Sequence, residues 1–144
     1  MGILPSSNKI VFNSVNRRPG LNRSAAASWL KAVLVKEKKA LNCININFCD
    51  DEYLLGINQE FLQHDYYTDI ITFDLSDQDG LIEADIYISL DRVRENAKLL
   101  KSSADKELKR VMLHGLLHLC GYNDKTKGEI AQMRGKEELY LKLI

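Results

Sequence analysis

The chain of 144 residues lacks several features that would place it in a specialised class of protein. Its three cysteines form no CxxC pair, and their odd number argues against a disulfide framework. No apolar run approaches the roughly 18 residues that a bilayer-spanning helix needs, and no signal peptide is recognisable at the start of the chain. We therefore expect a protein of the reducing cytoplasm that has no membrane segment.

The chain also lacks a net charge, because 20 Lys and Arg residues balance 20 Asp and Glu residues. The charges are unevenly spread, since residues 1–40 hold eight bases against one acid and residues 41–100 hold three bases against thirteen acids. A basic end on a neutral protein is compatible with a face that binds a polyanion. Charge runs are more often solvated helix faces and loops, so both interpretations stay open at this point.

Hydrophobic periodicity predicts one α+β domain over residues 1–144, without internal repeats or linkers. We expect strands over residues 9–15, 43–50, 70–75 and 83–90, and helices over residues 24–40, 50–63, 89–100, 102–120 and 126–144. This order predicts a small four-stranded mixed sheet packed with about five helices. The helix over residues 102–120 is apolar on nearly every side, so it should lie near the centre.

Two histidines interrupt that apolar helix, in the stretch HGLLHLCGYND at residues 114–124. His114 and His118 are four positions apart, about 40° around a helix axis, so they share one face. A buried polar group without a partner costs roughly 1–3 kcal/mol. Two such rings on one face are satisfied either by hydrogen bonds within the core or by a single metal ion.

The residues that follow favour the metal ion. Gly121 stands where a helix end adopts the left-handed conformation and turns the chain back. Asp124 lies three residues later, so its carboxylate returns toward the histidines as a third ligand acceptable to zinc. The pattern H-x-x-x-H-x-x-G-x-x-D shares its spacing with the metzincin motif. Cys120 lies about 240° around the helix from His114 and is excluded, so three ligands leave the open position typical of catalytic zinc.

The glutamate that serves zinc peptidases as a general base is missing. It would directly follow the first histidine, where this chain has Gly115. A glycine inside a helix costs about 1 kcal/mol relative to alanine, so its presence needs a reason. One interpretation is close packing against a neighbouring strand, and the other is room for a bulky substrate beside the metal. Either interpretation disfavours a metzincin-like peptidase.

The stretch HGLLHLCGYND resembles the H-G-x-L-H-L-x-G-Y-D-H motif of the YbeY family of metal-dependent endoribonucleases and ribosomal RNA maturation factors. Residues 57–75 look like that family's L-N-x-x-Y-R-x-x-D-x-x-T-D-V-L-S-F segment, and residues 83–90 look like its G-D-I-x-I-S strand. The resemblance covers roughly residues 43–140. It implies a zincin-like site with one zinc ion per chain, held by His114, His118 and Asp124.

The resemblance also implies what such a site does. We expect an endoribonuclease that cleaves single-stranded RNA with a zinc-bound water, in small-subunit ribosomal RNA maturation and ribosome quality control. RNA and the ribosome would be its partners, whereas the oligomeric state does not follow from the sequence. The alternatives are a ribosome-associated RNA-binding factor with a mainly structural zinc and, disfavoured by Gly115, a metallopeptidase.

The sequence departs from the resembled family at two positions. Asp124 stands where the family usually has histidine, and Leu62 stands where it has a functional arginine. The cationic contact to RNA would then come from elsewhere. Arg110, one turn before His114, is the candidate charge stabiliser, and Asp85 is the candidate partner of a metal ligand. The candidate RNA-binding bases are Arg17, Arg18 and Arg23, and the candidate base-stacking residues, which are equally packing residues, are Tyr66, Tyr67 and Tyr122.

Overall fold

The computed structural model describes residues 7–144, which form an α+β fold. Its elements are, in chain order, β1 (Lys9–Ser14), α1 (Arg23–Lys36), β2 (Ala40–Cys49), α2 (Asp51–Leu62), β3 (Ile70–Asp74), β4 (Leu81–Ser89), α3 (Leu90–Leu99), α4 (Ala104–Leu119) and α5 (Lys127–Leu141). The predicted fold class is confirmed. One domain over the whole of residues 1–144 stays a prediction, because residues 1–6 lie outside the described part.

The four strands form one mixed sheet in the order β1-β2-β4-β3. β1, β2 and β4 run parallel, and β3 pairs antiparallel with β4. The parallel pairs follow from the long connections, since α1 joins β1 to β2 and α2 lies in the crossover from β2 to β4. β3 is therefore an edge strand, and α4 packs against it and against β4.

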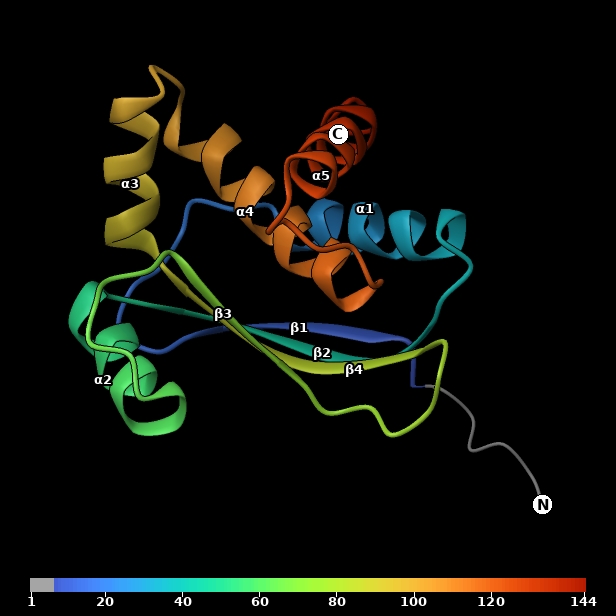
Figure 1. Ribbon diagram of the computed structural model, residues 1–144, viewed down its shortest axis with the longest axis horizontal. Helices are drawn as coiled ribbons and strands as arrows, with labels where there is room; N and C mark the ends of the chain where they lie inside the picture. The colour runs from blue at the N-terminus through green and yellow to red at the C-terminus, as the bar shows by residue number, and fades with distance from the viewer. Residues whose placement is uncertain (1–6) are drawn as a thin grey trace.

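Helices α1, α3, α4 and α5 cover one face of the sheet, and α2 lies beyond its other face at one end (Figure 1). The main core lies between the sheet and the larger helical layer, where Ile86 of β4 joins Met112 and Leu116 of α4. A smaller core packs Leu54 of α2 against Ile71 of β3. α4 contacts α3, α5 and the sheet, so the histidine-bearing helix lies near the centre, as predicted.

Each helix begins at a polar residue whose side chain accepts a hydrogen bond from the first turn. These caps are Asn22, Asp50, Ser89, Ser103 and Thr126. They satisfy N–H groups that have no partner inside the helix, and such a cap typically contributes about 1 kcal/mol. Thr126 and Glu129 form a reciprocal capping box, which fixes the start of α5 directly after the turn that carries Asp124.

The helices are short, and α1 is shorter than the apolar pattern predicts. It ends at Lys36, and Lys38 takes a positive φ of 59° in the turn that follows. This turn lets β2 begin at Ala40 and brings Leu41 into the core. The longest helix, α4, has 16 residues. Within residues 7–144, no helix combines the length and the apolar character needed to cross a membrane.

Candidate metal centre

α4 carries both histidines at the margin of a largely buried helix. Its apolar residues pack into the main core, whereas the side chains of His114 and His118 remain 20% and 32% exposed. The two imidazole rings meet edge to face with centroids 4.6 Å apart. The two histidines therefore share one accessible face, as their spacing predicts.

The end of α4 turns the chain back toward these histidines. Gly121 has a φ of +105°, a conformation that residues with a Cβ rarely adopt. Its N–H donates to the carbonyl of His118 at 3.0 Å, and the N–H of Tyr122 donates to the carbonyl of Leu117 at 3.1 Å. These bonds satisfy carbonyls that the helix leaves open. The reversal brings Asp124 beside the histidine face.

Three donor atoms converge at this point. His118 Nε2 lies 3.0 Å from His114 Nε2, and Asp124 Oδ2 lies 3.2 Å from His114 Nε2 and 3.4 Å from His118 Nε2. Donors bound tetrahedrally at about 2.0–2.1 Å from zinc would lie roughly 3.3 Å apart. The spacing therefore fits one such ion. Within residues 7–144 this is the one group of three or more His, Cys, Asp or Glu residues arranged in this way.

The second ring nitrogen of His114 has a partner of its own. Its Nδ1 lies 2.7 Å from Oε2 of Glu137, a buried residue of α5. Burial lowers the pKa of His114, but the hydrogen bond and charge of Glu137 and the charge of Asp124 raise that pKa by more. The contact between Nδ1 and Glu137 orients the imidazole of His114 with its Nε2 toward His118 and Asp124.

Arg110 lies close to His114, as expected, but its guanidinium is already paired. It donates two hydrogen bonds to Glu107, at 2.8 and 2.7 Å, and lies 3.5 Å from Glu137. The hydrogen bond to Glu107 is the largest cause of its raised pKa. Arg110 therefore faces two carboxylates, which leaves little of its charge for a phosphate.

An open pocket of about 250 Å³ adjoins the candidate metal ligands on the side of His114 and Asp124. His114 and Asp124 contribute to one part of its lining, and Met133 and Arg134 of α5 to another. Arg134 is exposed, and it makes no ion pair within the part of the chain that the structure describes. The pocket therefore offers one uncommitted positive charge beside the donor cluster.

Gly115 is buried against the edge strand. A Cβ placed on it would lie 2.6 Å from Cδ1 of Ile70 and 3.3 Å from Oγ1 of Thr72, both in β3. This contact supports the packing interpretation. The other interpretation, room for a bulky substrate beside the metal, is wrong, because β3 side chains fill the space next to this glycine.

Asp85 lies away from the donor cluster. Its neighbours in β4, Ala84 and Ile86, are buried on the helix-covered side, so the alternation of the strand directs Asp85 to the other face. There its Oδ1 accepts a hydrogen bond from Asn45 at 3.1 Å. The expectation that Asp85 lies beside a candidate metal ligand is thus wrong, and the carboxylate beside His114 is that of Glu137 instead. Leu62, at the end of α2, is not part of the pocket lining either.

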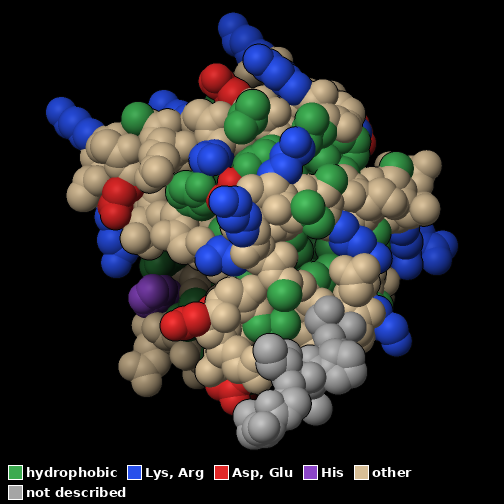
Figure 2. Space-filling view, turned by 90° about the vertical axis from the view of Figure 1, so that its right-hand side faces the viewer, with side chains coloured by type: hydrophobic (Ala, Val, Ile, Leu, Met, Phe, Trp, Pro, Cys, Tyr) green, Lys and Arg blue, Asp and Glu red, His purple; other side chains and the backbone are tan. Residues whose placement is uncertain are grey.

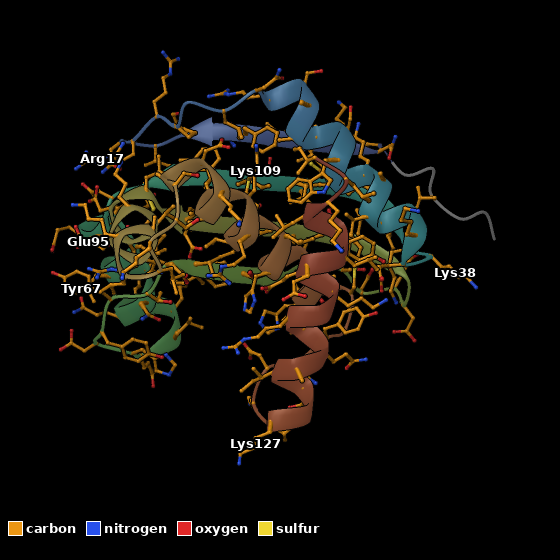
Figure 3. All side chains as sticks on the ribbon, turned by 90° about the horizontal axis from the view of Figure 1, so that it is seen from above. Arg17, Lys38, Tyr67, Glu95, Lys109 and Lys127 are labelled. Atoms are coloured by element: carbon orange, nitrogen blue, oxygen red, sulfur yellow. The ribbon has the colours of Figure 1, made fainter. Side chains whose placement is uncertain are left out.

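Two of the three arginines within residues 17–23 form contacts away from the donor cluster. Arg17 donates to Asp91 at 3.1 Å, and Arg23 donates to the carbonyl of Phe12 at 3.1 Å. Figure 3 shows Arg17 at one edge of the molecule, far from Lys127 at the start of α5. Arg18 is exposed and is likewise absent from the pocket lining. The structure does not bring these three arginines to the donor cluster.

The tyrosines have structural contacts. Tyr122 Oη donates to Glu37 at 2.7 Å, and the same carboxylate accepts hydrogen bonds from Tyr140 Oη and, at 3.2 Å, from Lys136 Nζ. This cluster ties the turn before Asp124 to α1 and α5. Tyr67 Oη donates to Glu52 at 2.6 Å, and Tyr66 Oη lies 2.9 Å from His64 Nδ1.

Sequence reasoning missed Glu137 and Arg134. Glu137 had a visible signal, because Met133, Glu137 and Tyr140 recur at the spacing of one buried helix face. An acid within such a face calls for a buried partner. Arg134 had no comparable signal, because an exposed arginine in a helix is ordinary and only the position of α5 brings it to the pocket.

Comparison with known proteins identifies the family and a similar fold. Residues 13–144 match the family model described as Endoribonuclease YbeY. A protein of Cytophaga hutchinsonii with that name is 54% identical over 121 residues, 84% of this chain and 85% of the relative. One of Porphyromonas gingivalis is 49% identical over 126 residues, 88% of this chain and 83% of the relative. A solution structure from Thermotoga maritima has a TM-score of 0.69 at 26% identity, covering 93% of this chain and 87% of the other.

Proposed function

Since the chain belongs to the YbeY family of endoribonucleases, we propose that it is a zinc-dependent enzyme that cleaves single-stranded ribosomal RNA. The proposed role is maturation of small-subunit ribosomal RNA and ribosome quality control in the cytoplasm, with the ribosome as partner. The membership itself establishes an RNA-cleaving hydrolase, and the zinc ion and the ribosomal substrate are the parts proposed here.

The convergence of the three donor atoms is the observation that carries this proposal. His114 and His118 would supply imidazole nitrogens, and Asp124 would supply a carboxylate oxygen. This donor set suits zinc, and three protein ligands leave a coordination position for the substrate. When bound, the ion supplies Lewis acidity, which polarises a phosphoryl oxygen and acidifies water at neutral pH.

The residues around the pocket would hold the RNA beside that ion. Arg134 has an exposed guanidinium, which is a planar donor well matched to two oxygens of a phosphate. It would thus supply the cationic contact that the sequence lacks at Leu62. Arg110 would bind protein carboxylates and not the RNA, since its charge is shared between Glu107 and Glu137.

The decisive experiment measures zinc and RNA cleavage in the same preparations. Wild type, His118→Ala and the control His64→Ala are compared, because His64 lies outside the donor cluster. We expect about one zinc per chain in wild type and in His64→Ala, and loss of zinc in His118→Ala. Cleavage of single-stranded RNA should follow the zinc content, stop after chelation and return when zinc is added.

Two outcomes would contradict the proposal in different ways. Unchanged cleavage by protein freed of metal would remove the role of the ion in catalysis. Full zinc content with RNA binding but no cleavage would favour the RNA-binding factor with a structural zinc. A peptidase is disfavoured by the structure, because the position after the first histidine is a buried glycine against β3 and carries no carboxylate.

A further inference from the structure

Glu137 is a carboxylate in a place where carboxylates are rare. It comes from α5, it is 5% exposed, and it lies between Met133 and Tyr140 on the face of the helix that enters the core. Acids are almost never buried to this degree unless they are paired. The nearest partner is His114, whose Nδ1 lies 2.7 Å from Glu137 Oε2.

The second oxygen of Glu137 is also occupied. Oε1 lies 3.5 Å from a terminal nitrogen of Arg110, and the same guanidinium donates two hydrogen bonds to Glu107, which is 2% exposed. A continuous chain of contacts therefore runs from Glu107 through Arg110 and Glu137 to His114. Glu107, Arg110 and His114 belong to α4, whereas Glu137 belongs to α5. Contacts from α4 to both oxygens of Glu137 therefore fix the position and the orientation of its carboxylate.

The local charge favours a cation on the far side of His114. Arg110 is one positive charge between the carboxyl groups of two buried residues, Glu107 and Glu137. One guanidinium therefore does not neutralise its surroundings. Asp124 adds a further acid at the donor cluster itself. Together these groups leave an excess of negative charge that a divalent cation would offset.

We propose that Glu137 is a positioning residue for the metal centre. Its carboxylate accepts the proton on Nδ1 of His114 and so keeps the Nε2 lone pair directed at the ion, and the pair Arg110–Glu107 holds the carboxylate in place. A metal-bound imidazole whose other nitrogen donates to a carboxylate is oriented more firmly and is a stronger base. This inference rests on the proposed metal site and adds to it a residue from α5.

Zinc affinity tests the inference, because a merely structural contact between two helices would change stability without changing affinity. We compare wild type, Glu137→Gln and the control Glu138→Gln, which alters the exposed neighbour on α5. The amide keeps the size of the side chain and removes its charge. We expect Glu137→Gln to remain folded and to bind zinc about 10- to 100-fold more weakly in competition with a chelator. Glu138→Gln should bind zinc as wild type does.

A second measurement uses the wild-type protein alone, so that it stands even if the variant fails to fold. Nitrogen-15 chemical shifts of the zinc-loaded protein should show the proton of His114 on Nδ1 and the metal on Nε2. The opposite tautomer would overturn the inference, as would a folded Glu137→Gln protein whose zinc affinity equals that of wild type. Failure of wild type to bind zinc at all would instead overturn the proposed metal centre.

Discussion

At the scale of single residues, the third donor is the most unusual member of the cluster. Asp124 offers a carboxylate where the resembled family usually offers an imidazole, and its side chain is 40% exposed. The carboxylate brings a negative charge to the ion, whereas two imidazoles bring none. Because the side chain of Asp124 is more exposed than those of His114 and His118, this donor should be held by fewer protein contacts than the two histidines.

Substitution of each donor gives the first prediction. His114→Ala and His118→Ala should lose tightly bound zinc, because each removes one of three protein ligands. Asp124→Ala should weaken zinc binding, whereas Asp124→His should keep or tighten it. Chelator competition measures all four affinities. Zinc content equal to wild type in either histidine variant, or tighter binding by Asp124→Ala, would contradict the assignment.

Gly115 gives the second prediction, on stability. Alanine is favoured over glycine inside a helix by about 1 kcal/mol, but its Cβ would lie 2.6 Å from Cδ1 of Ile70. Ile70→Val removes that methyl group. Gly115→Ala should therefore be more favourable in the Ile70→Val background than in wild type, with a coupling of about 1 kcal/mol. Urea unfolding of the two single variants and the double variant measures the coupling, and simple additivity would refute the contact.

At the scale of elements, α5 does more than cover the sheet. It supplies Glu137 to His114 and Arg134 to the pocket, and its Lys136 and Tyr140 bind Glu37 at the end of α1. Tyr122, in the turn between α4 and α5, binds the same carboxylate. The position of α5 relative to α4 is therefore held from both sides of the donor cluster.

The Glu37 cluster gives the third prediction. Burial raises the pKa of Glu37, but hydrogen bonds from Tyr140, Tyr122 and Lys136 lower it by more, so the pKa lies below the ordinary 4.5. The carboxylate therefore contributes stability that is complete above about pH 4.5 and is lost as the pH falls through the lower pKa of the folded state. Glu37→Gln should lower the free energy of unfolding by about 1–3 kcal/mol near neutral pH.

The control for this prediction is Glu138→Gln, which removes an exposed acid from the same part of the fold. Urea unfolding at several pH values should show the deficit of Glu37→Gln shrinking as the solution becomes acidic. A deficit that stayed constant, or that grew in acid, would mean that the carboxylate charge is not what holds the cluster together.

The elements themselves were largely predictable, since periodicity and capping residues are local. Asn22, Asp50 and Ser89 are residue types that favour helix starts, and their side chains do cap α1, α2 and α3. The contacts between α5 and α4 were not predictable, because they depend on how two helices pack. For that reason His114, His118 and Asp124 were found within one stretch of sequence, whereas Glu137 was not. The placement of Asp85 failed because the strand could be assigned but not its buried side.

At the scale of the whole molecule, the positive charges on one face are dispersed. Figure 2 shows Lys and Arg side chains scattered over the face that it presents, with apolar and acidic side chains between them. Arg17 and Arg23 are held in contacts within the protein. RNA would thus find no extended basic surface on this face, so we expect few phosphate contacts, close to the donor cluster.

The dependence of RNA binding on salt gives the fourth prediction. Each phosphate contact to single-stranded RNA steepens the plot of log affinity against log salt by roughly 0.7. Arg134→Gln should flatten that slope by about one contact and weaken binding, whereas Arg18→Gln, at an exposed position outside the pocket, should not. Binding is measured on zinc-free protein to avoid cleavage. Equal slopes for wild type and Arg134→Gln would exclude this arginine as a phosphate contact.

The compact origin of the donors has a consequence for the order of folding. All three come from residues 114–124, so bringing them together requires one helix and one short loop closure, an event of roughly 10–100 ns for a loop of ten residues. Glu137 arrives only when α5 docks on α4. Capture of an ion would therefore need only this local segment, with the imidazoles still free to rotate, and the docking of α5 would then lock one of them. A newly made chain would bind its ion loosely first and retain it firmly only after its last helix has folded.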